Sequence, residues 1–229
     1  MGVVIGMDEA GYGPNLGPLV VTTTVWEVEG SPHDFNFWRE FRGVIAQKPP
    51  TDHSHVQVAD SKEVHNSAKG VGALEIGVLC ALALQGELPQ TLRGLWERVA
   101  AWPEVDDWEP WFDGGDLELP HACHEAPLEK FIAKWRKRCE SRGVRLRQVR
   151  SDIVMTRRFN RLTQSHDSKG VALSRISLQL LGDVWNPSGD EPTLVICDKH
   201  GGRNRYDTLL QEIAGDEFIL CRGEGMERS

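Results

Sequence analysis

The stretch of sequence that decides the fold lies at the start of the chain, at residues 2–26: GVVIGMDEAGYGPNLGPLVVTTTVW. Two apolar runs rich in β-branched residues, 2–8 and 17–30, predict strands that pair across the glycine and proline turn between them. Asp8 and Glu9 put two adjacent carboxylates at the end of the first run. Neighbouring side chains on a strand point to opposite faces, so both acids can serve one site only where the strand breaks. We expect the glycine-rich turn to supply that break between them.

Strand and helix signals alternate along the rest of the chain. Further strands are expected at residues 55–60, 143–152, 193–198 and 217–221. Helices are expected at residues 35–42, 68–86, 92–102, 125–143, 167–185 and 204–215. The run TLVICD at residues 193–198 is apolar up to Asp198, which is typical of a central strand covered on both faces. We therefore expect a single α/β domain over residues 1–229, with a Trp-rich insertion at about residues 88–124.

The composition argues against several classes of protein. Of the 229 residues, 40% are apolar, which is enough for a large core. No run approaches the roughly 20 apolar residues of a membrane-spanning helix, and the first residues do not resemble a secretion signal. The five cysteines are scattered and form no C-x-x-C pair. These features favour a cytoplasmic protein with no membrane partner, and they leave its oligomeric state open.

Charge is unevenly distributed along the chain, whose net charge is −8. Nine acidic residues and no lysine or arginine lie from Glu104 to Glu129, whereas twelve basic residues and only two acids lie from Lys130 to Arg161. Such a basic segment is either a solvated surface or a surface that follows a nucleic-acid backbone. Both interpretations stay open, and binding that weakens steeply with salt would favour the second.

Asp8 and Glu9, beside glycines whose backbone is open to a ligand, have the chemistry of a site for a hard cation and a phosphate. Asp198 ends another apolar run and is followed by two glycines and several basic residues, among them Arg203, a candidate substrate contact. Hydrolysis of a phosphodiester uses carboxylates from separate strands that converge on two metal ions about 4 Å apart. The alternatives are a solvated turn for the first pair of acids and a helix N-cap for Asp198.

These motifs together resemble the type 2 ribonuclease H family. The resemblance rests on DEAGYGP and the GP that follows, within residues 8–18, on ADSK at residues 59–62, and on the late Asp198. It implies a ribonuclease H-like fold, with a mixed sheet flanked by helices. It also implies hydrolysis of the RNA strand of RNA–DNA hybrids with Mg²⁺ or Mn²⁺, which leaves a 5′-phosphate and a 3′-hydroxyl. Beyond these motifs, the chain matches the family only in the order of its elements, so we expect a divergent branch.

The resemblance assigns roles to particular residues of this chain. Asp8, Glu9 and Asp198 match the family's catalytic, metal-binding acids. Gly11 and Gly13 match glycines whose amides lie against the nucleic-acid strand near the ribose 2′-hydroxyl. A further set of residues, expected near a sugar, a base or a phosphate, comprises Tyr12, Ser61 and Lys62. Tyr12 stands where the family usually has arginine, which puts specificity for a junction ribonucleotide in question.

The family's fourth acid and the helix after it have no clear counterpart before Ser229. Glu224 and Glu227 are candidates by spacing alone, and we expect a missing C-terminal segment that carries this ligand. The sequence therefore predicts a metal-dependent endoribonuclease, slow or inactive in this form if it is truncated. The alternative is a noncatalytic relative that binds nucleic acid with an incomplete set of acids. A third possibility is a protein-interaction module built on the Trp-rich insertion.

Overall fold

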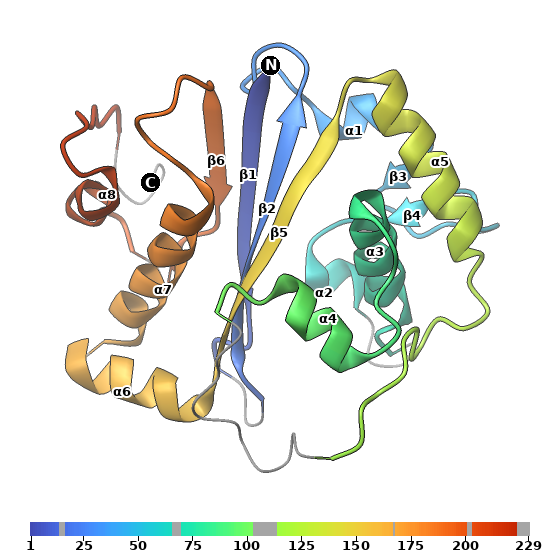
Figure 1. Cartoon of the computed structure of the whole chain (residues 1–229), viewed down its shortest axis with the longest axis horizontal. Coiled ribbons are helices and arrows are strands. Elements are labelled where there is room, and N and C mark those ends of the chain that lie inside the picture. The colour runs from blue at the N-terminus through green and yellow to red at the C-terminus, as the bar shows by residue number, and fades with distance from the viewer. Residues whose placement is uncertain (14–16, 66–69, 103–113, 167, 201–202, 224–229) are drawn as a thin grey trace.

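The computed structural model describes residues 1–13, 17–65, 70–102, 114–166, 168–200 and 203–223. At its centre is a four-stranded sheet in the order β5-β2-β1-β6. Its strands are β1 (Gly2–Ala10), β2 (Leu19–Val28), β5 (Arg145–Val154) and β6 (Thr193–Cys197). β2 runs antiparallel to both β1 and β5, whereas β6 is parallel to β1. The predicted α/β class, with a mixed sheet flanked by helices, is confirmed (Figure 1).

The predicted pairing of the first two strands is confirmed, but the expected break between the two acids is not there. β1 pairs with β2 continuously, with Asp8 opposite Thr22 and Glu9 opposite Val21. The backbone leaves the strand only after Ala10, at Gly11, whose φ is +83°. Continuous pairing preserves the alternation of side chains, so the two carboxylates start from opposite faces of the sheet.

Helices cover both faces of the sheet (Figure 1). On one side lie α7 (Lys169–Val184) and α8 (Asp207–Ala214), with α6 (Thr156–His166) packed against α7. The other side carries α1 (Phe37–Glu40), α3 (Gly72–Leu82) and α5 (Leu128–Ser141). The smaller elements are β3 (Ile45–Ala46), β4 (Val56–Gln57), α2 (Ser61–Val64), the 3₁₀ helix η1 (Ala83–Gln85) and α4 (Leu92–Val99). None of the helices in the described ranges has the length and hydropathy of a membrane span.

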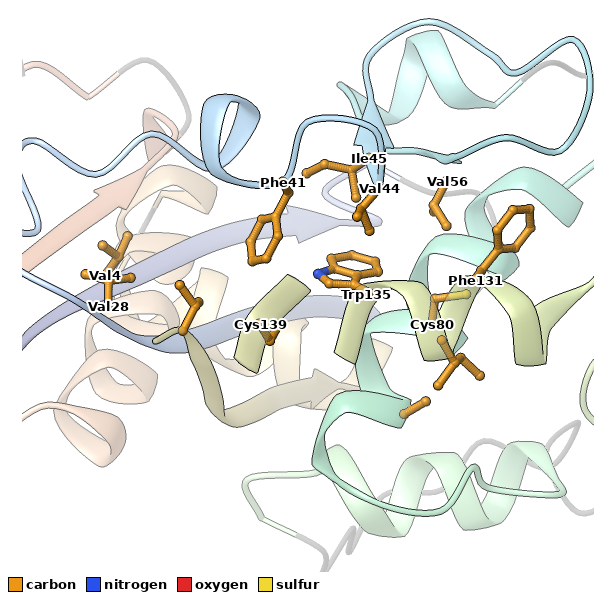
Figure 2. Close-up of a cluster of buried hydrophobic side chains, with 13 residues drawn as sticks. Val4, Val28, Phe41, Val44, Ile45, Val56, Cys80, Phe131, Trp135 and Cys139 are labelled. Carbon is orange, nitrogen blue, oxygen red and sulfur yellow. The ribbon is translucent and has the colours of Figure 1, made fainter. Parts of the chain in front are cut away.

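Alternation along β1 divides the core between these two sides. Val3, Ile5 and Met7 pack against α7 and α8 through residues such as Leu181 and Leu209. Val4 belongs instead to the cluster on the other side, drawn in Figure 2. There the rings of Phe41 and Trp135 lie 6.0 Å apart, edge to face, next to the side chains of Val44 and Cys139. Aromatic pairs in this arrangement add to the stabilisation that burial gives.

Of the two strands predicted near the end of the chain, the one at residues 193–198 is confirmed as β6 but is not central, and the one at residues 217–221 is not formed. β6 is an edge strand, because no described strand pairs with its outer side, and Ile196 is 56% exposed. Residues 217–221 form no strand, and Phe218 and Leu220 are 87% and 64% exposed. An apolar run forms a stable strand only where a neighbour accepts its backbone hydrogen bonds. Among the described residues, none does so for 217–221.

Several helices follow the sequence pattern with shifted ends. The short strand expected at residues 55–60 stops at Gln57, and Asp60 instead caps α2 by accepting a hydrogen bond from the Lys62 amide. The cap of α7 is Ser168.

One helix, α6, was not predicted. Within the expected insertion, described segments pair through Leu92–Leu117 and Leu119–Gln90 backbone hydrogen bonds, and Trp108 and Trp111 lie outside the described residues.

Candidate active site

Asp8 and Asp198 lie at the same end of two neighbouring parallel strands. The last residues that pair between β1 and β6 are Met7 and Cys197, and each is followed directly by an aspartate. Parallel strands lie about 4.8 Å apart, and paired positions put their side chains on the same face of the sheet. The sequence expectation that these two strand ends meet is therefore matched by the strand register.

The two aspartates share one local arrangement. Asp8 Oδ1 accepts a hydrogen bond of 2.8 Å from the amide of Glu9, and Asp198 Oδ1 accepts one of 2.7 Å from the amide of Lys199. Each carboxylate is thus folded onto the next peptide group, which fixes one of its oxygens. An ionised carboxylate has about four lone-pair sites, so both side chains keep acceptor capacity for a cation.

Glu9 lies close enough to both aspartates for their charges to act on it. Burial of the carboxyl group, and then the negative charges of Asp8 and Asp198, raise the pKa of Glu9 above its ordinary value. The pKa of the Cys197 thiol is also raised, first by burial and then by Asp198 and Glu9. Although Glu9 starts from the opposite face of the strand, three carboxylates share one electrostatic environment at this edge of the sheet.

Gly11 is required by the turn itself. Besides its positive φ, a Cβ built on Gly11 would lie 2.5 Å from the carbonyl oxygen of Pro18, so no other residue fits without a backbone shift. Gly13 is exposed and has open space where a Cβ would be. Tyr12 is half-buried and packs against the core cluster that contains Leu19 and Val21. The predicted contacts of these three residues with nucleic acid stay predictions.

Ser61 and Lys62 lie on α2 and are exposed. No contact between them and the three acids is recorded in the described part of the chain. α2 does border the same space as the acids' strands: a cavity of about 520 Å³ is lined by Val64 of α2, Gly6 of β1 and Ile196 of β6. Gly6 precedes Asp8 by two positions on the same face of β1, so the cavity lies between α2 and the part of β1 that leads to Asp8.

The loop after Asp198 contains contacts that sequence reasoning missed. The amide of His200 donates to Tyr206 Oη at 2.9 Å, and Arg203 Nε donates to Ser174 Oγ at 3.0 Å. His200 and Ser174 are 3% and 0% exposed. A serine among the leucines of α7 was the one available signal, because a polar residue in an apolar stripe needs a partner. Arg203, the predicted substrate contact, is thereby fixed against α7.

The basic segment from Lys130 to Arg161 is largely committed to partners within the chain. Arg147, for example, bonds Glu27 and Glu191, and Arg138 donates to the backbone oxygens of Glu40 and Arg42. At least eight of its twelve basic residues form hydrogen bonds or ion pairs with described residues, and they include Lys134, Arg136, Arg138, Arg142, Arg145, Arg147, Arg150 and Arg158. Carboxylates balance the charge of Arg142, Arg145, Arg147, Arg150 and Arg158, whereas the other three bond backbone oxygens. These internal contacts favour a surface role for most of this segment.

The donor chemistry of the site fits a divalent cation. Three carboxylates whose charges repel one another are the oxygen ligands that Mg²⁺ and Mn²⁺ prefer, and a cation would remove the repulsion that raises the pKa of Glu9. Within the described ranges, no three His, Cys, Asp or Glu side chains are already gathered as a metal-binding group. The candidate metal site is therefore centred on Asp8 and Asp198. The possible fourth ligands Glu224 and Glu227 lie outside the described residues.

Comparison with known proteins does not assign the chain to a family. No protein-family model, curated protein or solved structure matches it.

Proposed function

We propose that the chain is a metal-dependent endoribonuclease of the ribonuclease H type, which hydrolyses the RNA strand of RNA–DNA hybrids. One observation carries this proposal. Met7 and Cys197 are register partners, so Asp8, near the end of β1, and Asp198, directly after β6, lie at the same end of two neighbouring strands. The mixed sheet with helices on both faces is compatible with the fold that the resemblance in DEAGYGP implies. Gly11, the first glycine of that motif, has a positive φ, which favours glycine.

The reaction adds water across a phosphodiester. The water oxygen bonds to phosphorus, the bond from phosphorus to O3′ breaks, and O3′ takes up a proton, which leaves a 5′-phosphate and a 3′-hydroxyl. When bound at Asp8, Glu9 and Asp198, Mg²⁺ or Mn²⁺ supplies the charge that acidifies water and stabilises the leaving oxygen. The carboxylates hold that charge beside the phosphate. Gly11 holds the turn, and Gly13, which has open space where a Cβ would be, leaves the backbone accessible to the RNA strand. Ser61 and Lys62 bind a phosphate farther along it.

Cleavage of a labelled RNA–DNA hybrid in Mg²⁺ tests the proposal. Asp8→Asn and Asp198→Asn should each lower the rate roughly 100-fold or more, because each removes a charge from the site. Asp190→Asn is the matched control, since Asp190 is an exposed acid in the loop before β6. It should cleave as fast as the wild type. Equal cleavage by Asp8→Asn and the wild type would contradict the assignment.

The same assay separates the proposal from the noncatalytic alternative. Hybrid binding is measured in EDTA, where no cleavage occurs, and turnover is measured in Mg²⁺ and in Mn²⁺. Hybrid binding without turnover in either metal would support a nucleic-acid-binding relative. Turnover that is lost in Asp8→Asn would support the nuclease.

A further inference from the structure

A cavity with a largely polar lining lies at the start of α7, and one of its lining residues, His200, follows Asp198 by two positions. Its volume is about 410 Å³, and we call it the α7 cavity. His200 and residues 203–205 form one wall, and the first turn of α7 forms the other. Its polar and glycine lining consists of Ser168, Gly170, His200, Arg203, Asn204 and Arg205. Among the described residues that line it there is no carboxylate, and its two arginines give this lining a positive charge.

Arg203 is held in place by a buried relay. Its Nε donates to Ser174 Oγ, and the Ser174 hydroxyl in turn donates to the carbonyl oxygen of Gly170 at 2.8 Å. Ser174 is fully buried, so this relay fixes the near end of the guanidinium group. Arg203 and Arg205 form no ion pair with any carboxylate in the described residues. The cavity therefore holds a positioned guanidinium and a second, exposed one.

His200 provides an independent indication of a ligand. The side chain lines the cavity and is 3% exposed, yet its Nδ1 has no hydrogen-bond partner in the described structure. Its ring stands edge to face against Tyr206, and its amide bonds the Tyr206 hydroxyl. A buried polar atom without a partner carries a free-energy cost that a ligand with a matching group removes. With its proton on Nδ1, this imidazole is a hydrogen-bond donor.

The first turn of α7 adds backbone donors. The initial N–H groups of a helix have no acceptor within the helix, and the macrodipole of this 16-residue helix favours an anion at its start. Ser168 Oγ accepts from the amide of Val171, which ties the cap to the helix. Two arginines, an imidazole and a helix start are all donors to a multivalent oxyanion.

We propose that the α7 cavity binds a phosphate group. The group comes either from free phosphate or from a backbone phosphodiester of the substrate, and the second source rests on the proposed function. His200 lies two residues after Asp198, so a backbone phosphate held here would fix the strand on the β6 side of the three acids. Such an anchor would position substrate while Asp8 and Asp198 carry the reaction.

Binding of inorganic phosphate to the full chain tests the cavity without any cleavage. Thermal unfolding is followed as phosphate replaces chloride at constant ionic strength, since a ligand that binds only the folded state raises the midpoint. The wild type should show a rise that saturates. Arg203→Met and Arg205→Glu should bind phosphate roughly ten-fold more weakly, because each removes a charge-assisted contact. Arg205 is exposed, so its replacement leaves folding intact.

Two matched variants make the result specific. Arg175→Met removes another α7 arginine, one paired with Glu212 away from the cavity, and should keep wild-type phosphate affinity. Asp8→Asn should also keep it, because the cavity does not depend on the acid cluster. No rise with phosphate in the wild type, or the same affinity in Arg205→Glu as in the wild type, would overturn the proposal.

A second arm identifies the source of the phosphate. Fluorescence anisotropy measures the Kd of a hybrid without terminal phosphates, in EDTA so that no cleavage occurs. Roughly ten-fold weaker binding by Arg205→Glu than by Arg175→Met assigns the cavity to the backbone. If the two variants bind the hybrid equally well but Arg205→Glu binds inorganic phosphate more weakly, the cavity is a site for free phosphate. A failure of hybrid binding in every variant would count against the proposed function, while the phosphate titration would still decide the cavity.

Discussion

Met7 of β1 and Cys197 of β6 lie opposite each other in a parallel pair of strands, and an aspartate follows each of them. Residues about 190 positions apart in the sequence thus bring two carboxylates to one edge of the sheet. Glu9 responds to both charges, since its pKa is raised by burial, by Asp8 and by Asp198. The three carboxylates repel one another in the absence of a cation. Removing one of these charges should therefore stabilise the metal-free protein.

Glu9→Gln should stabilise the metal-free protein at neutral pH. An acid whose folded pKa is raised contributes stability at low pH, and that contribution is lost as pH rises from the ordinary value near 4.5 through the raised value. The gain should be less than about 1 kcal/mol because Glu9 is partly exposed, and it should vanish below about pH 4.5. Urea unfolding in EDTA from pH 4 to pH 8 measures it.

In Mg²⁺ the wild type should become more stable than Glu9→Gln. If Glu9 is a ligand, adding the ion stabilises the wild type more than Glu9→Gln, whereas Asp190→Asn responds as the wild type does. A variant that gains as much stability from Mg²⁺ as the wild type would show that Glu9 does not bind the ion.

Gly11→Ala should be the most damaging substitution among three glycine positions. Gly11 has a φ of +83°, and the new Cβ would lie 2.5 Å from the carbonyl oxygen of Pro18. Together these should lower the free energy of unfolding by about 2–3 kcal/mol. Gly43 has a φ of +79° but open space, so Gly43→Ala should cost about 1 kcal/mol. Gly13→Ala, with neither constraint, should stay within about 0.5 kcal/mol of the wild type. Denaturant unfolding of the three variants gives the ranking, and equal losses would refute the role of the close approach.

The sequence predicts well those features that are encoded within one element. The apolar spacing along residues 125–143 predicts α5, whose Phe131, Ile132 and Trp135 are buried as expected. The pairing of β1 with β2 follows similarly from two β-branched runs and a short turn. Periodicity is a local property, so one element is enough to reveal it.

Features that depend on a partner elsewhere in the chain were not predicted. The run TLVIC is as apolar as a central strand, but its position at the sheet edge depends on which strands pair with it. α6 has only two apolar residues in packing contact, Phe159 and Leu162, and its place depends on α7. The course of β1 through Glu9 is another such case. The sequence suggested a break between Asp8 and Glu9, but pairing with β2 keeps the strand regular there.

Arg147→Met should leave hybrid binding almost unchanged although it removes a cation from the basic segment. Arg147 is bonded to Glu27 and Glu191, and these hydrogen bonds raise its pKa, so its charge is balanced within the protein. We expect a Kd within a factor of about two of the wild type and the same dependence on salt. Anisotropy titrations between low and moderate salt measure both. A flatter salt dependence would show that Arg147 contacts a phosphate.

The cysteines should differ strongly in reactivity. Burial raises the pKa of Cys80 and Cys123 to about 12 and that of Cys139 to about 11, so these thiols stay protonated at pH 8. Cys221 is exposed and should react fastest with a disulfide reagent, followed by Cys197, whose pKa is raised by burial and by Asp198. Mass spectrometry after a brief reaction identifies the modified sites. Fast modification of Cys80 in the native protein would contradict the described packing.

Arg158→Met should destabilise the protein by about 2–3 kcal/mol. Asp152 is 2% exposed and accepts two hydrogen bonds from Arg158, at 2.5 and 2.9 Å, and the guanidinium carbon lies 5.8 Å from the Trp102 ring centroid. Removing the arginine leaves a buried carboxylate without its partner, which costs more than the pair itself contributes. The estimate is below the usual range for buried pairs because Arg158 is itself 33% exposed.

Two further variants distinguish that mechanism from a simple loss of contacts. Asp152→Asn in the Arg158→Met background should restore more than half of the loss, because it removes the unpaired charge. Arg175→Met, which breaks an exposed pair with Glu212, should cost less than about 1 kcal/mol. Urea unfolding at pH 7 provides all three values. If the double variant were as unstable as Arg158→Met, packing of the arginine against Trp102, rather than neutralisation of Asp152, would be its main contribution.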